Sequence, residues 1–278
     1  MKQIFSQFGV VKTALVIINK YKKIRVRMKI LKWMLVGCLA SFTMFSQAKD
    51  VSVVLMYHQI AHYKNDMNTT PELFKQQMEY LYENNYNVVP AMDLVEAITK
   101  KKALPPKSVI ITFDDGWATQ KAAMEVLKKY NYPAMFALIT EYQTFKNRTY
   151  LQRDDIEKYG ADNFTFVNHS HTHFVKDFLG FPEHDVETSK AQIIRTTGKF
   201  VPIYVYPYGK KNKELIEALK KNSYIAGFGV YSYPVNVKTA NIFNINRYLM
   251  NDKVDLERFK QIVSQTDPIK KEQKNATL

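Results

Sequence analysis

Short apolar runs alternate with longer amphipathic segments along most of the chain from residue 51 onward. A short apolar run predicts a buried strand, and apolar residues spaced three or four apart predict a helix. The expected strands are 51–56, 88–89, 108–113, 134–139, 164–167, 203–206, 224–228 and 242–246. The expected helices are 71–83, 92–101, 118–130, 154–159, 185–196, 213–222 and 255–265.

Polar residues follow at least four of the expected strands, at the point where each apolar run ends. They are His58, Asp114 with Asp115, the segment 169–173 and the segment 207–209. Alternating strands and helices predict parallel strands joined by crossover helices. A barrel gathers many strand ends around one mouth, whereas an open sheet gathers them mainly at one switch point. The pattern therefore favours an α/β barrel with its chemistry at the carboxyl ends of the strands.

The N-terminus has the features of a secretory signal. A basic start at Met28 is followed by an apolar run over 33–45 and by small residues that end at Ala48, which is the usual order in a signal peptide. The apolar run is too short to cross a bilayer, which takes about 20 residues. The alternative is a lipoprotein signal in which Cys38 carries the lipid. Either signal predicts an exported protein, whether periplasmic, cell-surface or extracellular.

These features divide the chain into three expected parts. Residues 1–48 form an N-terminal extension with its signal at 28–48, residues 49–266 form one domain, and residues 267–278 form a polar tail. Cys38 is the single cysteine. A chain without its signal peptide would therefore have neither disulfides nor thiolate metal sites, so any metal must be held by histidine and carboxylate.

The formal net charge of +14 lies mainly in the N-terminal extension. Nine of the 40 basic residues and none of the 26 acidic residues fall within 1–48. The rest of the chain has a modest charge and lacks a basic patch with interleaved aromatic residues, which disfavours nucleic-acid binding. We expect no nucleic-acid partner, and contact with a membrane only through the signal peptide or a lipid on Cys38.

The apolar run of the third expected strand ends in two adjacent carboxylates, Asp114 and Asp115, followed by Gly116. Adjacent side chains on an extended segment point in opposite directions, so the two carboxylates have different roles unless the chain turns. One can bind a metal while the other acts as a base. A simple turn at the end of a strand is the alternative, because Asp and Gly are common turn residues.

Three histidines, His169, His171 and His173, follow the expected strand 164–167. Imidazole is the usual ligand for zinc and related metals. His169 and His173 share a face if the segment turns helically, and all three share a face if it is extended; the residues alone do not decide. Two histidines and one carboxylate leave room for water, which is typical of a hydrolytic metal centre. Zinc is the expected metal, and nickel or cobalt suits the same ligands.

Such a centre also needs a base that takes a proton from water and an acid that protonates the leaving group. Asp114 is the candidate base. His58, at the end of the first expected strand, is the candidate acid. The Pro-Tyr-Gly turn at 207–209 can expose a backbone N–H that stabilises an oxyanion.

Two of these motifs together resemble those of the NodB-like polysaccharide deacetylases, carbohydrate esterase family 4. They are Thr-Phe-Asp-Asp-Gly at 112–116 and His-Ser-x-x-His at 169–173. The resemblance extends over roughly residues 51–265. It implies a distorted, incomplete (β/α) barrel with parallel strands.

The resemblance also assigns a role to each candidate residue. It implies that Asp114 is the catalytic base. The metal ligands that it implies are Asp115, His169 and His173. The segment 206–209, Tyr-Pro-Tyr-Gly, resembles the third motif of the family, in which the N–H at the position of Tyr208 helps to form the oxyanion hole. The residues that we expect to contact the substrate are Trp117, Tyr206 and Pro207.

The sequence departs from the usual family pattern in two places. The Arg that usually precedes the Pro of the third motif is absent, and no His occurs after His184 to form the usual C-terminal Leu-x-His. Instead, Leu-Met-Tyr-His58 stands at the start of the domain. This order is similar to the circularly permuted branch that de-N-acetylates poly-β-1,6-N-acetylglucosamine, which implies His58 as the acid. Arg247 is a candidate replacement for the missing Arg beside Asp114.

The resemblance thus implies a metal-dependent hydrolase that removes N-acetyl groups from an N-acetylglucosamine polymer, with poly-β-1,6-N-acetylglucosamine exopolysaccharide as the first candidate. One alternative is a deacetylase of peptidoglycan or chitin-like oligosaccharides. Another is a sugar-binding protein without activity. The glycan linkage, the metal and the role of His171 stay open at this point.

Overall fold

The computed structural model describes residues 50–63, 65–143 and 148–266. These residues belong to one folding unit, Gln47–Leu278. The predicted signal at 28–48, with Cys38, and the predicted tail at 267–278 lie outside the described residues. Within the described ranges, no helix is both long and apolar enough to span a membrane.

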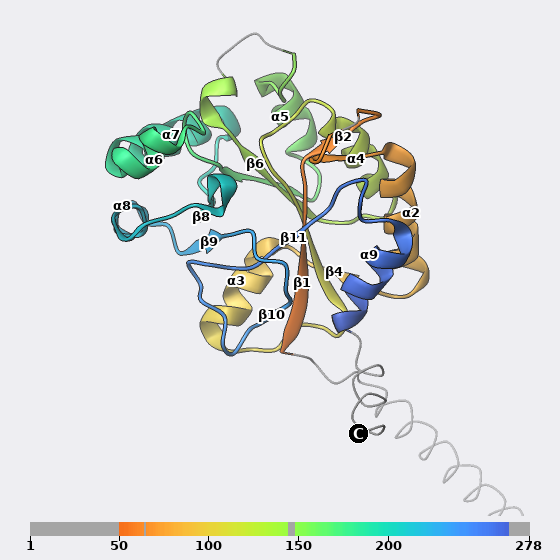
Figure 1. The fold of residues 1–278 in the computed structure, drawn as a ribbon. Helices are drawn as coiled ribbons and strands as arrows, with labels where there is room; N and C mark the ends of the chain where they lie inside the picture. Colours follow the sequence, from red (N-terminus) through yellow and green to blue (C-terminus); the bar gives the residue numbers. More distant parts are fainter. Residues whose placement is uncertain (1–49, 64, 144–147, 267–278) are drawn as a thin grey trace, which may run out of the picture. The chain divides into compact units, whose positions relative to one another are not determined.

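A curled, mostly parallel sheet lies at the centre of this unit (Figure 1). Its strands run in the order β10, β1, β5, β6, β7, β8, β9, with β11 also paired to β1 and β4 also paired to β5. The bounds are Val51–Tyr57 (β1), Asn87–Val88 (β4), Ser108–Phe113 (β5), Ala134–Leu138 (β6), Phe164–Asn168 (β7), Ile203–Val205 (β8), Ala226–Phe228 (β9), Val235–Asn236 (β10) and Tyr248–Leu249 (β11). In this sheet only β10 is antiparallel to its neighbour.

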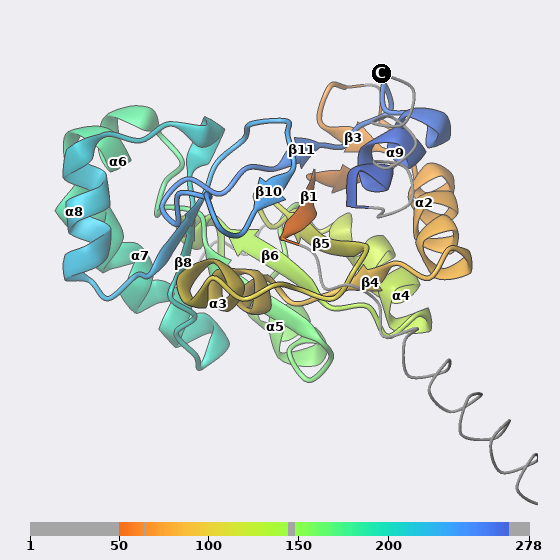
Figure 2. The same cartoon turned by 90° about the horizontal axis from the view of Figure 1, so that it is seen from below.

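Helices surround the sheet, as the views in Figures 1 and 2 both show. They are Pro71–Glu83 (α2), Ala91–Lys100 (α3), Gln120–Lys129 (α4), Arg153–Tyr159 (α5), Val175–Gly180 (α6), Pro182–Thr197 (α7), Lys213–Lys221 (α8) and Leu256–Val263 (α9). The short elements are Gln59–Ile60 (β2), Asn68–Thr69 (β3), Thr140–Gln143 (η1), Pro207–Gly209 (η2) and Ser264–Thr266 (η3).

The helix α2 illustrates how local sequence and packing agree. The Thr70 side chain accepts a hydrogen bond from the Leu73 N–H at 3.3 Å and caps the helix, and Pro71 occupies the first turn, where its missing N–H has no cost. The residues that α2 buries against the sheet follow a helical period: Phe74, Gln77, Met78 and Leu81.

The sheet is buried on both faces, because alternate side chains of each strand enter different core clusters. On one face, Tyr57, Phe113 and Phe136 form a continuous stack with ring centroids 5.4 and 4.7 Å apart, and side chains of α2, α4 and α9 pack around it. On the other face, Val54 and Ile110 pack in a cluster that includes α3. In the sequence, strands buried on both faces have continuous apolar runs. These strands fix the positions of the polar residues that follow them.

The predicted distorted, incomplete (β/α) barrel with parallel strands is confirmed. The two ends of the strand order, β9 and β10, are not paired with each other in the described part of the chain, so the barrel is not closed. The predicted strand 242–246 is wrong. Only Ile245 forms a bridge there, to Phe228, because the Asn241 side chain accepts a hydrogen bond from the Phe243 N–H at 2.9 Å and bends the chain.

Candidate active site

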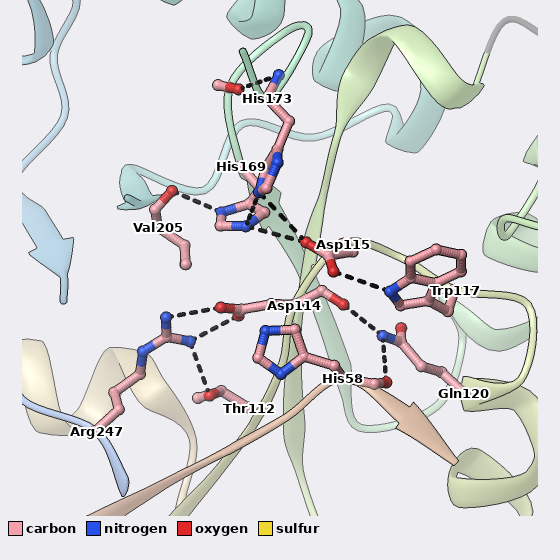
Figure 3. A network of polar contacts seen from close by, with 11 residues as sticks. His58, Thr112, Asp114, Asp115, Trp117, Gln120, His169, His173, Val205 and Arg247 are labelled. Carbon is pink, nitrogen blue, oxygen red and sulfur yellow. Dashed lines mark hydrogen bonds and ion pairs between the residues drawn. The ribbon is translucent and has the colours of Figure 1, made fainter. Parts of the chain in front are cut away.

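The polar residues singled out in the sequence meet at the carboxyl ends of the strands, around a cavity of about 610 Å³. His58 follows β1, Asp114 and Asp115 follow β5, and the segment 169–173 follows β7. The residues that line the cavity are Met56, His58, Met67, Asp114, Asp115, Trp117, Ile139, Tyr142, Tyr150, His169, His173, Tyr208, Val230, Ser232 and Leu249. Figure 3 shows how Asp114, Asp115 and the two histidines are arranged.

Asp115, His169 and His173 direct one ligand atom each toward a common point (Figure 3). Asp115 Oδ1 lies 3.4 Å from His169 Nε2 and 3.5 Å from His173 Nε2, and the two Nε2 atoms are 3.2 Å apart. A tetrahedral zinc site with bonds of about 2.0–2.1 Å places its ligand atoms about 3.3–3.4 Å from one another. The spacing and the chemistry of the three groups therefore fit a metal of this kind.

A hydrogen bond fixes the form of His169 that a metal requires. Its Nδ1 lies 2.8 Å from the Val205 carbonyl oxygen, which can only accept, so Nδ1 donates its proton there. Nε2 faces Asp115 and His173 and is the ring nitrogen available to a metal. A histidine ligand usually has such a partner on its second nitrogen. Asp115 is held from its other side, because Trp117 Nε1 donates to Oδ2 at 2.9 Å.

The chain turns sharply at each group of ligands. Asp115 and His173 have φ of 71° and 69°, and Ser170 has φ of 65°, a left-handed conformation that costs a non-glycine residue on the order of 1 kcal/mol or more. Gly116 follows with φ of 74°, and a Cβ there would lie 2.8 Å from Leu138 Cδ2, so only glycine fits. The turn after Asp114 is the reason that two adjacent carboxylates enter one site.

Burial and neighbouring charges shift the pKa values of Asp115, His169 and His173. Burial alone would raise the pKa of Asp115, but hydrogen bonding to His169 and the nearby histidines hold it well below its ordinary value. Burial opposes protonation of His169, but Asp114 and Asp115 outweigh it and raise its pKa. Burial and the neighbouring His169 lower the pKa of His173 to about 4. At neutral pH, Asp115 is therefore an anion and the His173 ring is neutral.

Asp114 is buried and forms a bidentate ion pair with Arg247, whose side chain is 0% exposed. Arg247 Nη1 donates to Oδ1 at 2.7 Å and Nη2 donates to Oδ2 at 2.8 Å. The guanidinium also donates to Thr112 Oγ1 at 3.2 Å and to the Gly229 carbonyl at 2.8 Å. Burial would raise the pKa of Asp114, but Arg247, together with His169 and His58, outweighs it and holds that pKa below its ordinary value. Arg247 thus lies beside Asp114, as the sequence analysis expected.

Gln120 joins the ends of β1 and β5. Its Nε2 donates to the Asp114 carbonyl at 2.6 Å and to the His58 carbonyl at 3.0 Å, so the backbones of the two residues are tied together. In Figure 3 the His58 ring lies next to Asp114 and Asp115. His58 thus lines the cavity and has a buried Nδ1 without a hydrogen-bond partner among the described residues.

Of the segment 206–209, only Tyr208 lines the cavity. Tyr208 is 60% exposed, has φ of 56° and lies with its ring 4.5 Å from that of His173. Tyr206 and Pro207 are buried and do not line the cavity. The expected contact of these two residues with a substrate stays a prediction. Trp117 does line the cavity, with its ring stacked 4.6 Å from that of Tyr150.

The third histidine of the cluster, His171, is turned away from the ligand group. Its Nδ1 lies 3.0 Å from Thr140 Oγ1. Its backbone N–H donates to Asp185 Oδ2 at 3.0 Å. The segment is therefore neither a regular helix nor fully extended, and its turns bring His169 and His173 together without His171.

Several residues of the site were not foreseen in the sequence. Tyr142 and Tyr150 flank the cavity from the segment 141–153, where no periodicity indicated structure. Asp185 lies on α7 and reaches the histidine segment, but no local pattern distinguishes it from other acidic residues of that helix. Gln120 is similar. Only contacts between distant parts of the chain identify these residues.

The fold and the site together define a class: an incomplete α/β barrel with a candidate Asp-His-His metal centre and a buried carboxylate beside it. Residues 101–227 match the family of polysaccharide deacetylases. The chain thus carries a polysaccharide deacetylase domain, which confirms the family, and the hydrolase class, that the sequence motifs implied.

Known relatives agree with this identification. The chain is 26% identical over 215 residues to the poly-β-1,6-N-acetyl-D-glucosamine N-deacetylase of Staphylococcus epidermidis, a match that covers 72% of each protein. It is also 26% identical over 177 residues to YxkH of Bacillus subtilis, where the match covers 63% of this chain and 62% of that protein.

Solved structures show the same fold. The deacetylase PplD of Streptococcus pyogenes, in complex with acetate, has a TM-score of 0.71 at 19% identity, over 77% of this chain and 98% of the other. IcaB from Ammonifex degensii has a TM-score of 0.68 at 21% identity, over 78% and 97% of the two chains.

Proposed function

We propose that this chain is a metal-dependent de-N-acetylase of an N-acetylglucosamine polymer, with poly-β-1,6-N-acetylglucosamine as its substrate. One observation carries the proposal: three ligand atoms that fit a divalent metal lie in an open cavity directly beside a buried, ionised carboxylate. Asp115, His169 and His173 would hold the metal, which is zinc by this set of ligands, with nickel or cobalt as alternatives. Such a metal supplies a Lewis acid that polarises an acyl oxygen and lowers the pKa of water.

In this proposal Asp114 is the general base. Arg247 occupies one lone pair on each carboxylate oxygen, which leaves other lone pairs free to accept a proton from the attacking water. The ion pair also keeps Asp114 ionised and fixes its orientation, which a base in a buried site requires. Attack of water on the N-acetyl carbonyl and cleavage of the C–N bond yield acetate and a sugar amine.

His58 and Tyr208 have the two other roles. His58 lies at the end of β1 beside Asp114, and its buried Nδ1 has no partner in the described part of the chain. We assign it as the acid that protonates the departing amine. The backbone N–H of Tyr208 is assigned to the developing oxyanion, because the turn at η2 brings this residue to the cavity rim next to His173.

The choice of polymer rests on the relatives and on the size of the cavity. Proteins named as poly-β-1,6-N-acetyl-D-glucosamine N-deacetylases match this chain over 70% or more of its length. A cavity of about 610 Å³ is within the usual range for small-molecule sites and is large enough for one sugar residue with its N-acetyl group. Aromatic rings of Trp117, Tyr142 and Tyr150 lie on one side of it, where they can contact the apolar face of a sugar.

The localisation follows from the sequence rather than from the described structure. We infer that the protein is exported through the signal at 28–48, either cut after Ala48 or lipidated at Cys38. N-terminal sequencing and mass measurement of the protein recovered from the producing cells distinguish the two forms.

Acetate release from defined oligosaccharides tests the proposed function. Protein stripped with a chelator should release no acetate from β-1,6-linked N-acetylglucosamine oligomers, and added Zn²⁺ should restore the activity. β-1,4-linked chitin oligomers and peptidoglycan fragments are the parallel substrates. Faster release from either of these would favour the alternative polymer, and glycan binding with no release at any metal would favour an inactive sugar-binding protein.

A further inference from the structure

Two neighbouring segments together form one wall of the cavity. The turn at 207–211 follows β8 and the segment 230–233 follows β9. They are in close contact, because a Cβ on Gly209 would lie 2.4 Å from Val230 Cγ2. Tyr208, Val230 and Ser232 line the cavity, so this wall is continuous with the candidate active site.

The same two segments carry three exposed tyrosines. Tyr208, Tyr231 and Tyr233 are 60%, 46% and 52% exposed, and the rings of Tyr231 and Tyr233 are 6.2 Å apart. Tyrosine rings present a rigid apolar surface and a polar hydroxyl, which suits contact with carbohydrate. Tyr208 lines the cavity, whereas Tyr231 and Tyr233 lie outside its lining, next to Val230 and Ser232, which belong to it. Exposed aromatic residues at the rim of a cavity often mark a binding surface.

Two lysines lie among these tyrosines. Lys210 Nζ is 6.0 Å from the centre of the Tyr208 ring, and Lys211 Nζ is 5.4 Å from the centres of both the Tyr206 and Tyr231 rings. No carboxylate of the described residues lies within 4.0 Å of either ammonium group. We call Tyr208, Lys210, Lys211, Tyr231 and Tyr233 the rim strip.

The rim strip therefore offers aromatic faces together with two uncompensated positive charges. Lys211 is partly buried, and burial lowers its pKa, so its charge is less screened by water than that of a fully exposed lysine. An uncharged N-acetylglucosamine residue can lie against such a surface. A glucosamine residue, which carries an ammonium group once its acetyl group has been removed, is repelled by it.

We propose that the rim strip is a subsite for sugar residues next to the one being hydrolysed, and that Lys210 and Lys211 make it select acetylated residues over residues that have already lost their acetyl group. This inference rests on the proposed deacetylase function. It predicts that the enzyme works on acetylated stretches and slows where its own product accumulates nearby.

Matched oligomers test the selection. The substrates are a fully acetylated β-1,6-linked hexamer and a hexamer of the same length in which the acetylated target residue is flanked by glucosamine. The wild-type protein should prefer the acetylated hexamer by about tenfold in kcat/KM at low ionic strength. The preference should shrink in high salt, because the Debye length falls from about 30 Å at 0.01 M to about 3 Å at 1 M.

Removal of the two charges gives the decisive comparison. In the Lys210→Gln/Lys211→Gln variant the preference should fall to within about twofold, because the glucosamine residues that flank the target are no longer repelled and kcat/KM for their hexamer rises. The control is Lys75→Gln/Lys129→Gln, which removes two exposed charges from α2 and α4 and should leave the preference as in the wild type. An unchanged preference in the Lys210/Lys211 variant, or no preference in the wild type, would overturn the inference.

The aromatic part of the rim strip has its own test. Tyr231→Ala/Tyr233→Ala should raise KM for the acetylated hexamer about fivefold and leave kcat, and the KM for a disaccharide, unchanged. Equal effects on both substrates would contradict a role in binding neighbouring sugars.

Binding measurements separate this inference from the proposed function. Dissociation constants of the two hexamers, measured with and without the Lys210→Gln/Lys211→Gln changes, need no turnover. If no acetate is released but the lysines still determine which hexamer binds, the rim strip stands and the deacetylase function fails. The opposite result is that acetate is released while the lysine changes alter neither the ratio of kcat/KM nor the ratio of dissociation constants between the two hexamers. In that case the function stands and the inference on the rim strip fails.

Discussion

The buried pair Asp114–Arg247 has the greatest energetic consequence among the single residues of the site. Both groups are removed from water, so their attraction must offset two desolvation costs, and four hydrogen bonds of the guanidinium help to do so. Removing one partner leaves an uncompensated buried charge, which typically costs about 3–5 kcal/mol. Arg247 thus supports both the fold and the orientation of Asp114.

We expect Arg247→Lys to fold but to lose at least about 100-fold in kcat. A lysine cannot form the bidentate pair, so Asp114 loses its fixed orientation while a positive charge stays nearby. Metal affinity, measured by competition with a chelator, should change little, because no metal ligand contacts Arg247 in the described structure. Arg153→Lys, on an exposed surface of α5, is the control. A kcat near that of the wild type would show that Arg247 does not position the base.

At the scale of elements, the histidine segment 169–173 depends on its neighbours for its shape. The Thr140 N–H donates to the Ser170 carbonyl at 3.2 Å and the Glu141 N–H donates to the His171 carbonyl at 3.0 Å. From the other side, Asp185 on α7 accepts a hydrogen bond from the His171 N–H. The elements η1 and α7 therefore hold the loop in the turns that bring the two candidate histidine ligands together.

Loss of the Asp185 carboxylate should therefore weaken metal binding without touching a ligand. We expect Asp185→Ala to lower the affinity for Zn²⁺ about 10–100-fold, as is usual when an outer support of a metal site is removed. Asp185→Asn keeps an acceptor oxygen and should have a smaller effect. Chelator competition measures both variants. Equal affinities in Asp185→Ala and the wild type would show that the loop holds its shape without α7.

The pH dependence of unfolding gives a second test of Asp185. Burial raises its pKa above the ordinary value, which is about 3.9 in an unfolded chain. Between these two pKa values the folded state binds more protons than the unfolded state, so the contribution of Asp185 to stability falls as pH rises. Relative to Asp185→Asn, the metal-free wild type should lose stability from about pH 4 upward. If the wild type instead gained stability relative to Asp185→Asn as pH rose, burial would not raise the pKa of Asp185.

At the scale of the whole domain, the metal should couple to folding, because the ligands come from β5 and β7 and meet only in the folded state. A ligand at 1,000 times its dissociation constant stabilises a fold by about 4 kcal/mol, which corresponds to roughly 10 °C for a domain of this size.

Added Zn²⁺ should therefore raise the Tm of the wild type by about this amount, and a chelator should reverse the shift. His173→Ala should remove the shift, and His62→Ala should keep it, because His62 is an exposed residue near Glu72. A shift of the same size in His173→Ala would place the metal elsewhere. Differential scanning calorimetry measures all three proteins.

The sequence predicted most of this architecture because the strands that form the centre of the sheet are buried on both faces. The run 108–113 is mostly apolar and is buried throughout, so both its extent and the carboxylates at its end could be predicted. The short edge elements could not, because β10 and β11 are only two residues long and depend on pairing with β1. The segment 242–246 is apolar enough to suggest a strand, but the Asn241 side chain bends it into a turn.

For the site, the sequence supplied the candidate ligands, base and acid and named Arg247 as a candidate partner of Asp114, and the fold shows which of these side chains meet. Arg247 is separated from Asp114 by more than 130 positions, and the two side chains meet because β11 pairs with β1 beside β5. Asp185, Gln120, Tyr231 and Tyr233 have no local signal in the sequence. Which two of the three histidines lie together could not be predicted from a helical or an extended pattern, because the segment 169–173 turns in a way that matches neither.

The central claim is the division of roles between the two adjacent carboxylates, and Asp114→Asn tests it most directly. The measurement is acetate release from an N-acetylglucosamine oligomer together with bound Zn²⁺ per chain, with Asp115→Asn as the matched variant. We predict that Asp114→Asn binds one Zn²⁺ and loses at least about 100-fold in kcat, whereas Asp115→Asn loses both the metal and the activity. Near-wild-type turnover by Asp114→Asn, or loss of its metal with the fold intact, would contradict the account.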